Sequence, residues 1–160
     1  MKKALCLISL LFVACTADFS VSEAFPDQCR WMDLVRVVDG DTIVVTGNER
    51  VRFIGIDSPE MKHPEKPVQH YSLESARELK RLLAGADKVC LLSDPQSDKK
   101  DKYNRTLAYV FRREGLDVNA QMLKIGAAKA YLWFEFSRKE EFKALADQAR
   151  SDQQGLWSQR

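Results

Sequence analysis

The stretch from residue 39 to residue 60, DGDTIVVTGNERVRFIGIDSPE, constrains the fold of this chain more than any other. Two acidic turn signals, DGD at 39–41 and DSPE at 57–60, flank two short runs of β-branched and apolar residues. Arg52 lies inside the second run. Carboxylates that converge in a fold repel one another unless a cation or a shared proton relieves them. The stretch therefore predicts a strand meander with a cation-binding polar site at its turns.

The remaining composition is that of one ordinary globular domain. The chain has 160 residues, of which 45% are hydrophobic and 30% charged, and its formal net charge is +2. A charge this small does not by itself indicate a nucleic-acid partner. It does not exclude a local basic patch either.

Residues 1–24 are predicted to be a secretory signal peptide and not part of the fold. Two lysines follow the first methionine, and residues 4–14 are apolar and uncharged. Such a run is too short to span a bilayer but has the length of a signal peptide's hydrophobic region. Small residues precede two candidate cleavage points, after Ala17 and after Ala24. The domain then covers residues 25–160, and the protein is expected to be exported, either secreted or periplasmic.

Two alternatives to simple cleavage stay open. The segment FVAC at 12–15 resembles a bacterial lipoprotein signal, which would place a lipid anchor on Cys15. A buried N-terminal helix is the other alternative.

Export would leave Cys29 and Cys90 as an even pair in an oxidising compartment. Neither cysteine has the spacing of a metal site, since the chain has no C-x-x-C motif. They are either two unrelated thiols or a disulfide between the first strand and a later one. We expect the disulfide.

Hydrophobic patterns predict five strands and three helices. The strands are expected at residues 29–38, 42–45, 50–56, 88–93 and 106–112. The helices are expected at 72–84, at 117–125 and from a capping box at 137–140 to about residue 155. Residues 128–136 form an aromatic, mostly extended segment. This order predicts an α+β protein, a five-stranded OB-fold Greek-key β-barrel with about three helices.

Several local details are also expected. Ser72 is predicted to cap the first helix and Ser137 the third, and Leu73 belongs to the apolar stripe of the first helix. Gly40 is expected to use its freedom to adopt positive φ in the first acidic turn.

Four blocks of the sequence resemble the signature of staphylococcal (micrococcal) nuclease-type thermonucleases. The blocks are DGDT at 39–42, RFIGIDSPE at 52–60, DKYNR at 101–105 and TLAY at 106–109. Their order and approximate spacing match that family from about residue 35 to residue 157. DGDT alone would be weak evidence, but the combination is specific.

The resemblance implies a Ca²⁺ site formed by Asp41, Asp57 and Ser58. The two aspartates would contribute carboxylates and Ser58 its backbone carbonyl, which are the oxygen ligands that this hard cation takes. Waters and a substrate phosphate would complete the shell. Asp39 precedes the turn glycine and is interpreted as a turn or supporting residue.

The resemblance also assigns catalytic roles. Glu60 is implied to be the general base, or at least to orient the attacking water. Arg52 and Arg105 are implied to bind the scissile phosphate, for which a planar guanidinium with two parallel donors is well suited.

Three more residues match substrate-binding positions of the family. Lys102 and Tyr103 correspond to residues that hold the terminal phosphate of a bound nucleotide. Tyr131 corresponds to a tyrosine near the nucleotide, but it fits the core of an apolar strand equally well.

The implied function is that of a monomeric, Ca²⁺-dependent endonuclease acting on DNA and RNA, leaving 3′-phosphate and 5′-hydroxyl ends. Two other classes are considered. A non-catalytic OB-fold nucleic-acid-binding module would be expected to lack a ligand or an arginine. A secreted Ca²⁺-binding structural or adhesion domain would not need two arginines beside the metal. Ser58 and Asn104 depart from the family pattern, in which threonine and glycine are usual.

Overall fold

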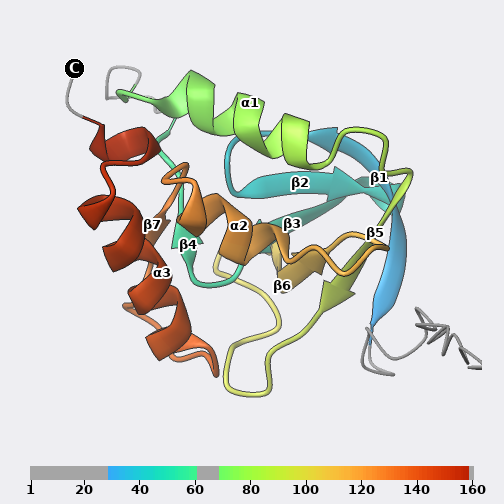
Figure 1. Cartoon of the computed structure of the whole chain (residues 1–160). Helices are drawn as coiled ribbons and strands as arrows, with labels where there is room; N and C mark the ends of the chain where they lie inside the picture. The colour runs from blue at the N-terminus through green and yellow to red at the C-terminus, as the bar shows by residue number, and fades with distance from the viewer. Residues whose placement is uncertain (1–28, 61–68, 159–160) are drawn as a thin grey trace, which may run out of the picture.

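The computed structural model describes residues 29–60 and 69–158. The predictions of a signal peptide at 1–24 and of a lipid anchor at Cys15 lie outside these ranges, as does most of the loop expected after Glu60. Five strands close into a barrel in the order β1-β2-β3-β6-β5 (Figure 1). The strands are β1 (Arg30–Val37), β2 (Thr42–Val45), β3 (Glu49–Phe53), β5 (Lys88–Leu92) and β6 (Thr106–Phe111). The predicted five-stranded OB-type barrel is confirmed.

The pairing of the strands explains how distant sequence blocks meet. Four of the five barrel contacts are antiparallel, and only β3 and β6 pair in parallel. Parallel neighbours require a long crossover connection. Here the crossover contains α1 and β5. It places the start of β6 beside β3, with Val51 opposite Thr106.

Three α-helices cover the barrel. They are α1 (Ser72–Leu82), α2 (Val118–Lys124) and α3 (Lys139–Ser151). Short 3₁₀ turns follow β2 (η2, Thr46–Asn48) and α3 (η3, Gly155–Trp157). In Figure 1, α1 lies across the top of the barrel, and the loop before β6 lies at the bottom. None of the helices in the described ranges is long and apolar enough to cross a bilayer.

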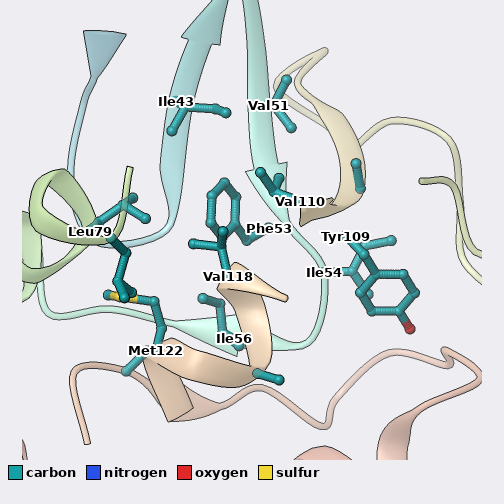
Figure 2. Packing of buried hydrophobic residues seen from close by; sticks show 14 of the residues in the cluster. Ile43, Val51, Phe53, Ile54, Ile56, Leu79, Tyr109, Val110, Val118 and Met122 are labelled. Atoms are coloured by element: carbon teal, nitrogen blue, oxygen red, sulfur yellow. The ribbon is translucent and has the colours of Figure 1, made fainter. Parts of the chain in front are cut away.

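The core forms where α1 and α2 close one end of the barrel. Figure 2 shows side chains of β3, α1 and α2 converging around the fully buried Phe53, among them Leu79 and Met122. The buried Asn119 of α2 also binds the barrel wall. Its carboxamide oxygen accepts from the Val110 N–H at 2.9 Å, and its nitrogen donates to the Ile54 carbonyl at 2.9 Å.

The third strand is shorter than predicted. It ends at Phe53 instead of residue 56, because Gly55 adopts a φ of +74° and turns the chain. A Cβ at Gly55 would lie 2.7 Å from the Phe142 ring, so the tight packing also requires glycine. After this bend, β4 (Ile56–Asp57) pairs with β7 (Lys129–Ala130) in a separate small sheet. Within the predicted extended segment 128–136, only Lys129–Ala130 form a strand.

The predicted helix caps and one core position are wrong. Tyr71, with a φ of +70°, precedes α1, and Ser72 is the first helical residue with its side chain buried. Leu73 is 52% exposed, because it lies outside the buried face of α1, which consists of Ser72, Ser75, Ala76, Leu79 and Leu82. The Ser137 hydroxyl donates to Asp94 rather than capping α3, which begins two residues later.

Cys29 and Cys90 form the expected disulfide, with Cα atoms 5.6 Å apart. The bond attaches the residue before β1 to β5, the strand that β1 pairs with. Cross-linking a loop of this length restricts the unfolded chain and stabilises the fold by about 4 kcal/mol in the chain-entropy model.

Replacing both cysteines with alanine should lower the free energy of unfolding by about that amount, measured by urea denaturation. Reductant should destabilise the unsubstituted protein equally and leave the double variant unchanged. Equal denaturation midpoints for the oxidised protein and the double variant would contradict the assignment.

Candidate active site

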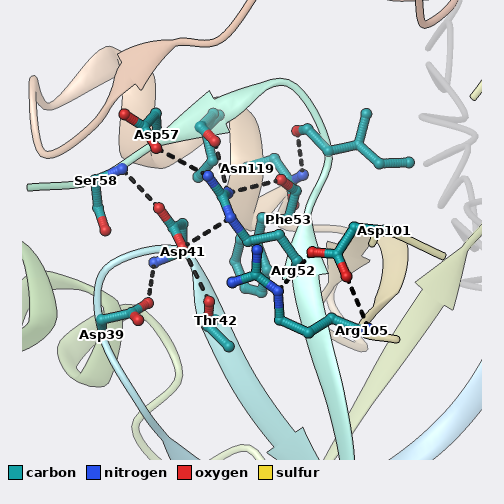
Figure 3. Close-up of polar contacts among 12 residues, drawn as sticks. Asp39, Asp41, Thr42, Arg52, Phe53, Asp57, Ser58, Asp101, Arg105 and Asn119 are labelled. Atoms are coloured by element: carbon teal, nitrogen blue, oxygen red, sulfur yellow. Dashed lines mark hydrogen bonds and ion pairs between the residues drawn. The ribbon is translucent and has the colours of Figure 1, made fainter. Parts of the chain in front are cut away.

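The acidic turns and two arginines meet on one side of the barrel. Figure 3 shows Arg52 on β3 in contact with Asp41, the residue just before β2, and with Asp57, the last residue of β4. Arg105, the residue just before β6, lies beside them. The structure thus brings together the aspartates and arginines that the sequence singled out.

Asp41 joins the two acidic turns. Its carboxylate is nearly fully buried, with Oδ2 accepting from the Ser58 N–H at 2.6 Å and Oδ1 from the Thr42 hydroxyl at 3.0 Å. Asp39 shapes the first turn, because its Oδ1 accepts from the Asp41 N–H at 3.1 Å. This contact fits the turn role expected for Asp39.

The two turns pack so closely that only glycine fits at position 40. A Cβ there would lie 1.9 Å from the Ser75 Oγ and 2.7 Å from the Ser58 Cβ. Gly40 is not among the residues with positive φ, so the expected reason for this glycine was wrong. Close approach, not backbone conformation, requires it.

Arg52 lies between the two carboxylates. Its Nε is 3.2 Å from Asp41 Oδ1, and its Nη2 is 3.0 Å from Asp57 Oδ1. Nη1 donates to the carbonyls of Ile56 at 2.6 Å and Phe53 at 3.1 Å. The side chain is only 12% exposed. Since arginine has five N–H groups, one on Nη2 is left over after these contacts with described residues.

Asp101 orients Arg105. Asp101 Oδ2 accepts from its Nε at 2.6 Å, and Asp101 Oδ1 accepts from the backbone N–H groups of Tyr103 and Arg105, each at 2.9 Å. Asn104, which replaces the usual glycine, adopts a φ of +60° within this turn. Both Nη groups of Arg105 remain without a hydrogen bond to any described residue, which leaves a two-donor fork for an anion.

The carboxylates have more negative charge than Arg52 offsets. Burial raises the pKa of Asp57, and the charge of Asp41 adds to this, while Arg52, Lys129 and Arg105 act in the opposite direction. Burial and the nearby Asp41 charge also raise the pKa of Asp39, to about 7. Raised pKa values of this kind arise when a carboxylate is removed from water beside another negative charge.

The donors fit a hard cation. The carboxylates of Asp41 and Asp57 contact one guanidinium from two sides, and Ser58 places a backbone carbonyl next to Asp57 in sequence. Oxygen donors of these types suit Ca²⁺. The described residues contain no cluster of three or more His, Cys, Asp or Glu side chains that could hold a metal.

Four other predicted site residues lie at the margin. Glu60 is exposed, and its backbone exchanges two hydrogen bonds of 3.1 Å with Gln69. Tyr103 is 69% exposed, with the Lys102 Nζ 5.0 Å from its ring centre and the Arg105 guanidinium 5.4 Å from it. Tyr131 is half-buried against Phe134 and does not belong to the hydrophobic core cluster.

Two site residues were missed in the sequence. Asp101 orients Arg105, and its position four residues before that arginine in DKYNR was an available signal. Lys129 lies opposite Asp57 in the β4–β7 pair and lowers its pKa. No pattern in the sequence indicated Lys129, because the two-residue pairing depends on the bend at Gly55.

The fold and the site together define an OB-fold protein with a carboxylate–arginine centre on the side of its barrel. A family model described as "Staphylococcal nuclease homologue" matches residues 50–159. The chain belongs to the staphylococcal nuclease family. The predicted family and the predicted enzyme class, a nuclease, are confirmed.

Individual relatives agree with this assignment. The thermonuclease of Staphylococcus hyicus is 32% identical over 159 residues, covering 97% of this chain and 92% of that protein. The thermonuclease of Staphylococcus intermedius is 34% identical over 155 residues, with coverages of 94% and 88%. The SPbeta prophage-derived endonuclease YokF of Bacillus subtilis is 38% identical over 130 residues, or 78% of this chain. The chain spans only 43% of the length of YokF.

Proposed function

We propose that the protein is an exported, Ca²⁺-dependent endonuclease that hydrolyses phosphodiester bonds of both DNA and RNA and leaves 3′-phosphate and 5′-hydroxyl ends. The family supports the reaction class. The observation that carries the proposal is the arrangement of Arg52 and Arg105 beside Asp41 and Asp57, with N–H donors of both arginines unused.

The carboxylates of Asp41 and Asp57 and the carbonyl of Ser58 would hold the cation. A bound Ca²⁺ would neutralise phosphate charge and orient a water. Burial and the charge of Asp41 raise the pKa values of Asp39 and Asp57, and a bound cation would relieve the repulsion among these carboxylates. Arg52 provides part of the positive charge from within the protein.

Arg52 and Arg105 would bind the scissile phosphate. The free Nη2 N–H of Arg52 and the two Nη groups of Arg105 could donate to its non-bridging oxygens. Negative charge builds on these oxygens as water adds to phosphorus, and donors already in place stabilise it without further reorganisation. Lys102 and Tyr103 would hold an adjacent phosphate, and Tyr131 would lie near the nucleotide.

Glu60 would accept the proton of the attacking water or orient that water. It follows Asp57 by three residues at the exposed edge of the site, where solvent reaches it. Its backbone contacts with Gln69 hold the segment but leave the carboxylate exposed.

The test of the proposal is a cleavage assay. The protein purified from residue 25 onward would be incubated with plasmid DNA and with RNA, in Ca²⁺, in Mg²⁺ and in chelator. We expect cleavage of both substrates with Ca²⁺, none with chelator, and 3′-phosphate ends on the products. Absence of cleavage with every metal would favour the non-catalytic binding module instead.

Replacing Glu60 with glutamine should lower kcat by about 10²- to 10⁴-fold, the range that a positioned general base contributes. Ca²⁺ affinity and the melting temperature should change little. Glu140→Gln, an equal substitution at an exposed position of α3, is the matched control. A Glu60→Gln variant with the turnover of that control would remove Glu60 from the mechanism.

Export and anchoring can be tested separately from activity. In a bacterial host, the full chain should be processed and recovered outside the cytoplasm. Incorporation of labelled fatty acid that is lost in Cys15→Ser would indicate a lipid anchor, and its absence would indicate simple cleavage.

A further inference from the structure

A groove lies next to the candidate active site and shares only Tyr103 with the predicted site residues. It is formed by the η2–β3 turn, the loop before β6 and the first residue of β1, and its volume is about 640 Å³. Its lining is Arg30, Asn48, Glu49, Arg50, Lys99, Lys100, Tyr103, Asn104 and Thr106.

The charge of this groove is strongly positive. Four basic residues line it against one acid, Glu49, in a chain whose total net charge is only +2. The Glu49 carboxylate already accepts hydrogen bonds from Arg30, at 2.6 and 3.0 Å, and from the Thr106 hydroxyl, at 2.6 Å. Its hydrogen bond to Arg30 lowers the pKa of Glu49 and keeps this ion pair in place.

The other three cations face solvent. Arg50, Lys99 and Lys100 are exposed, and in the described part of the chain no carboxylate lies within ion-pair distance of any of them. Lys100 instead donates to the Asn104 side chain at 2.9 Å, which braces the loop. Arg50 and Lys99 are therefore available to an anionic ligand.

The groove is continuous with the catalytic centre by two routes. Arg50 and Arg52 are two residues apart on β3, so their side chains leave the same face of the strand, about 7 Å apart along it. Tyr103 lines the groove, and the Arg105 guanidinium lies 5.4 Å from its ring. One row of cations thus begins in the groove and ends at the proposed scissile phosphate.

We propose that this groove binds the backbone of single-stranded nucleic acid on one side of the cleaved bond, with Arg50 and Lys99 each contacting a phosphate. This inference depends on the proposed function for the location of the cleaved bond. A positive groove beside an exposed aromatic ring is the combination by which proteins hold single strands without reading sequence. Tyr103 would separate the groove from the cleavage site and offer its ring to a base.

The test is binding of fluorescein-labelled single-stranded DNA in chelator, measured by anisotropy over a range of salt concentrations. Chelator prevents cleavage, so the result does not depend on catalysis. The variant Arg50→Ala/Lys99→Ala leaves Lys100 and its loop contact intact. We expect it to bind a 12-nucleotide strand at least about tenfold more weakly, with a salt slope reduced by about 1.4, two phosphate contacts at about 0.7 each.

The matched control is Arg77→Ala/Lys80→Ala, which removes the same charge from exposed positions of α1, a helix that does not line the groove. This control should bind the 12-nucleotide strand with the affinity of the unsubstituted protein. A 3-nucleotide strand should bind all of these proteins with equal affinity. Equal affinity and salt slope for the groove variant and this control would overturn the proposal. If the groove variant binds weakly but the unsubstituted protein cuts nothing, the groove stands and the nuclease function falls.

Discussion

Replacing Arg52 with alanine should lower the turnover of nucleic-acid cleavage by about a thousand-fold, the effect of removing a charged donor from a phosphoryl transition state. Arg52 is nearly buried, and its guanidinium contacts both carboxylates. One Nη2 N–H of this guanidinium is not used by these contacts and would donate to the phosphate. Lysine at this position would keep the charge but lose the fork, so Arg52→Lys should recover little of the activity.

Arg52→Ala should not weaken the binding of Ca²⁺. Arg52 competes with a cation for Asp41 and Asp57, so Ca²⁺ should bind Arg52→Ala at least as tightly as it binds the unsubstituted protein, as measured by calorimetry. The variant should melt at a lower temperature in chelator, because two carboxylates are left unpaired, and Ca²⁺ should restore part of the loss. Arg36→Ala, at an exposed position of β1, is the control. Near-normal turnover in Arg52→Ala would contradict the phosphate-binding role.

Replacing Asp57 with asparagine should lower Ca²⁺ affinity and activity at limiting Ca²⁺ by about a hundred-fold, because the site loses one of the two carboxylates proposed to hold the cation. Asp57 is a better position for this test than Asp41. The Asp41 carboxylate also accepts hydrogen bonds from the Ser58 N–H and the Thr42 hydroxyl, so its replacement would disturb the turns as well. The Asp57 side chain is about half exposed and contacts Arg52.

Calorimetric titration of Ca²⁺ and activity at increasing Ca²⁺ concentrations would measure this loss. Raising Ca²⁺ should restore part of the activity of Asp57→Asn but none of that of Arg52→Ala, which separates metal binding from phosphate binding. Asp87→Asn, at an exposed position before β5, is the matched control. An unchanged Ca²⁺ affinity in Asp57→Asn would place the metal elsewhere.

The barrel was predictable because local signals agreed along the chain. The β-branched run of β2, the apolar run of β6 and the turn residues along the chain left few other arrangements. The signature blocks located Asp41, Arg52, Asp57 and Arg105. These local signals do not contain the tertiary contacts of individual residues. Leu73 fits an apolar stripe by spacing but lies outside the contact between α1 and the barrel.

The remaining errors have a common physical cause. Ser137 has the composition of a helix cap, but Asp94, forty-three residues earlier, competes for its hydroxyl. Gly40 looked like a residue chosen for backbone freedom, whereas Ser75 leaves no room for a Cβ there. In each case a partner distant in sequence decides the outcome, and no local pattern records it.

The parallel pairing of β3 with β6 also determines when the site can assemble. The meander of β1, β2 and β3 brings Asp41 and Arg52 together through contacts that are short in sequence, and such contacts form early in folding. Arg105 arrives only when β6 closes the barrel across more than fifty residues, which is the kinetically slow kind of contact. During refolding, the recovery of catalytic activity should therefore lag behind the formation of the meander and report barrel closure.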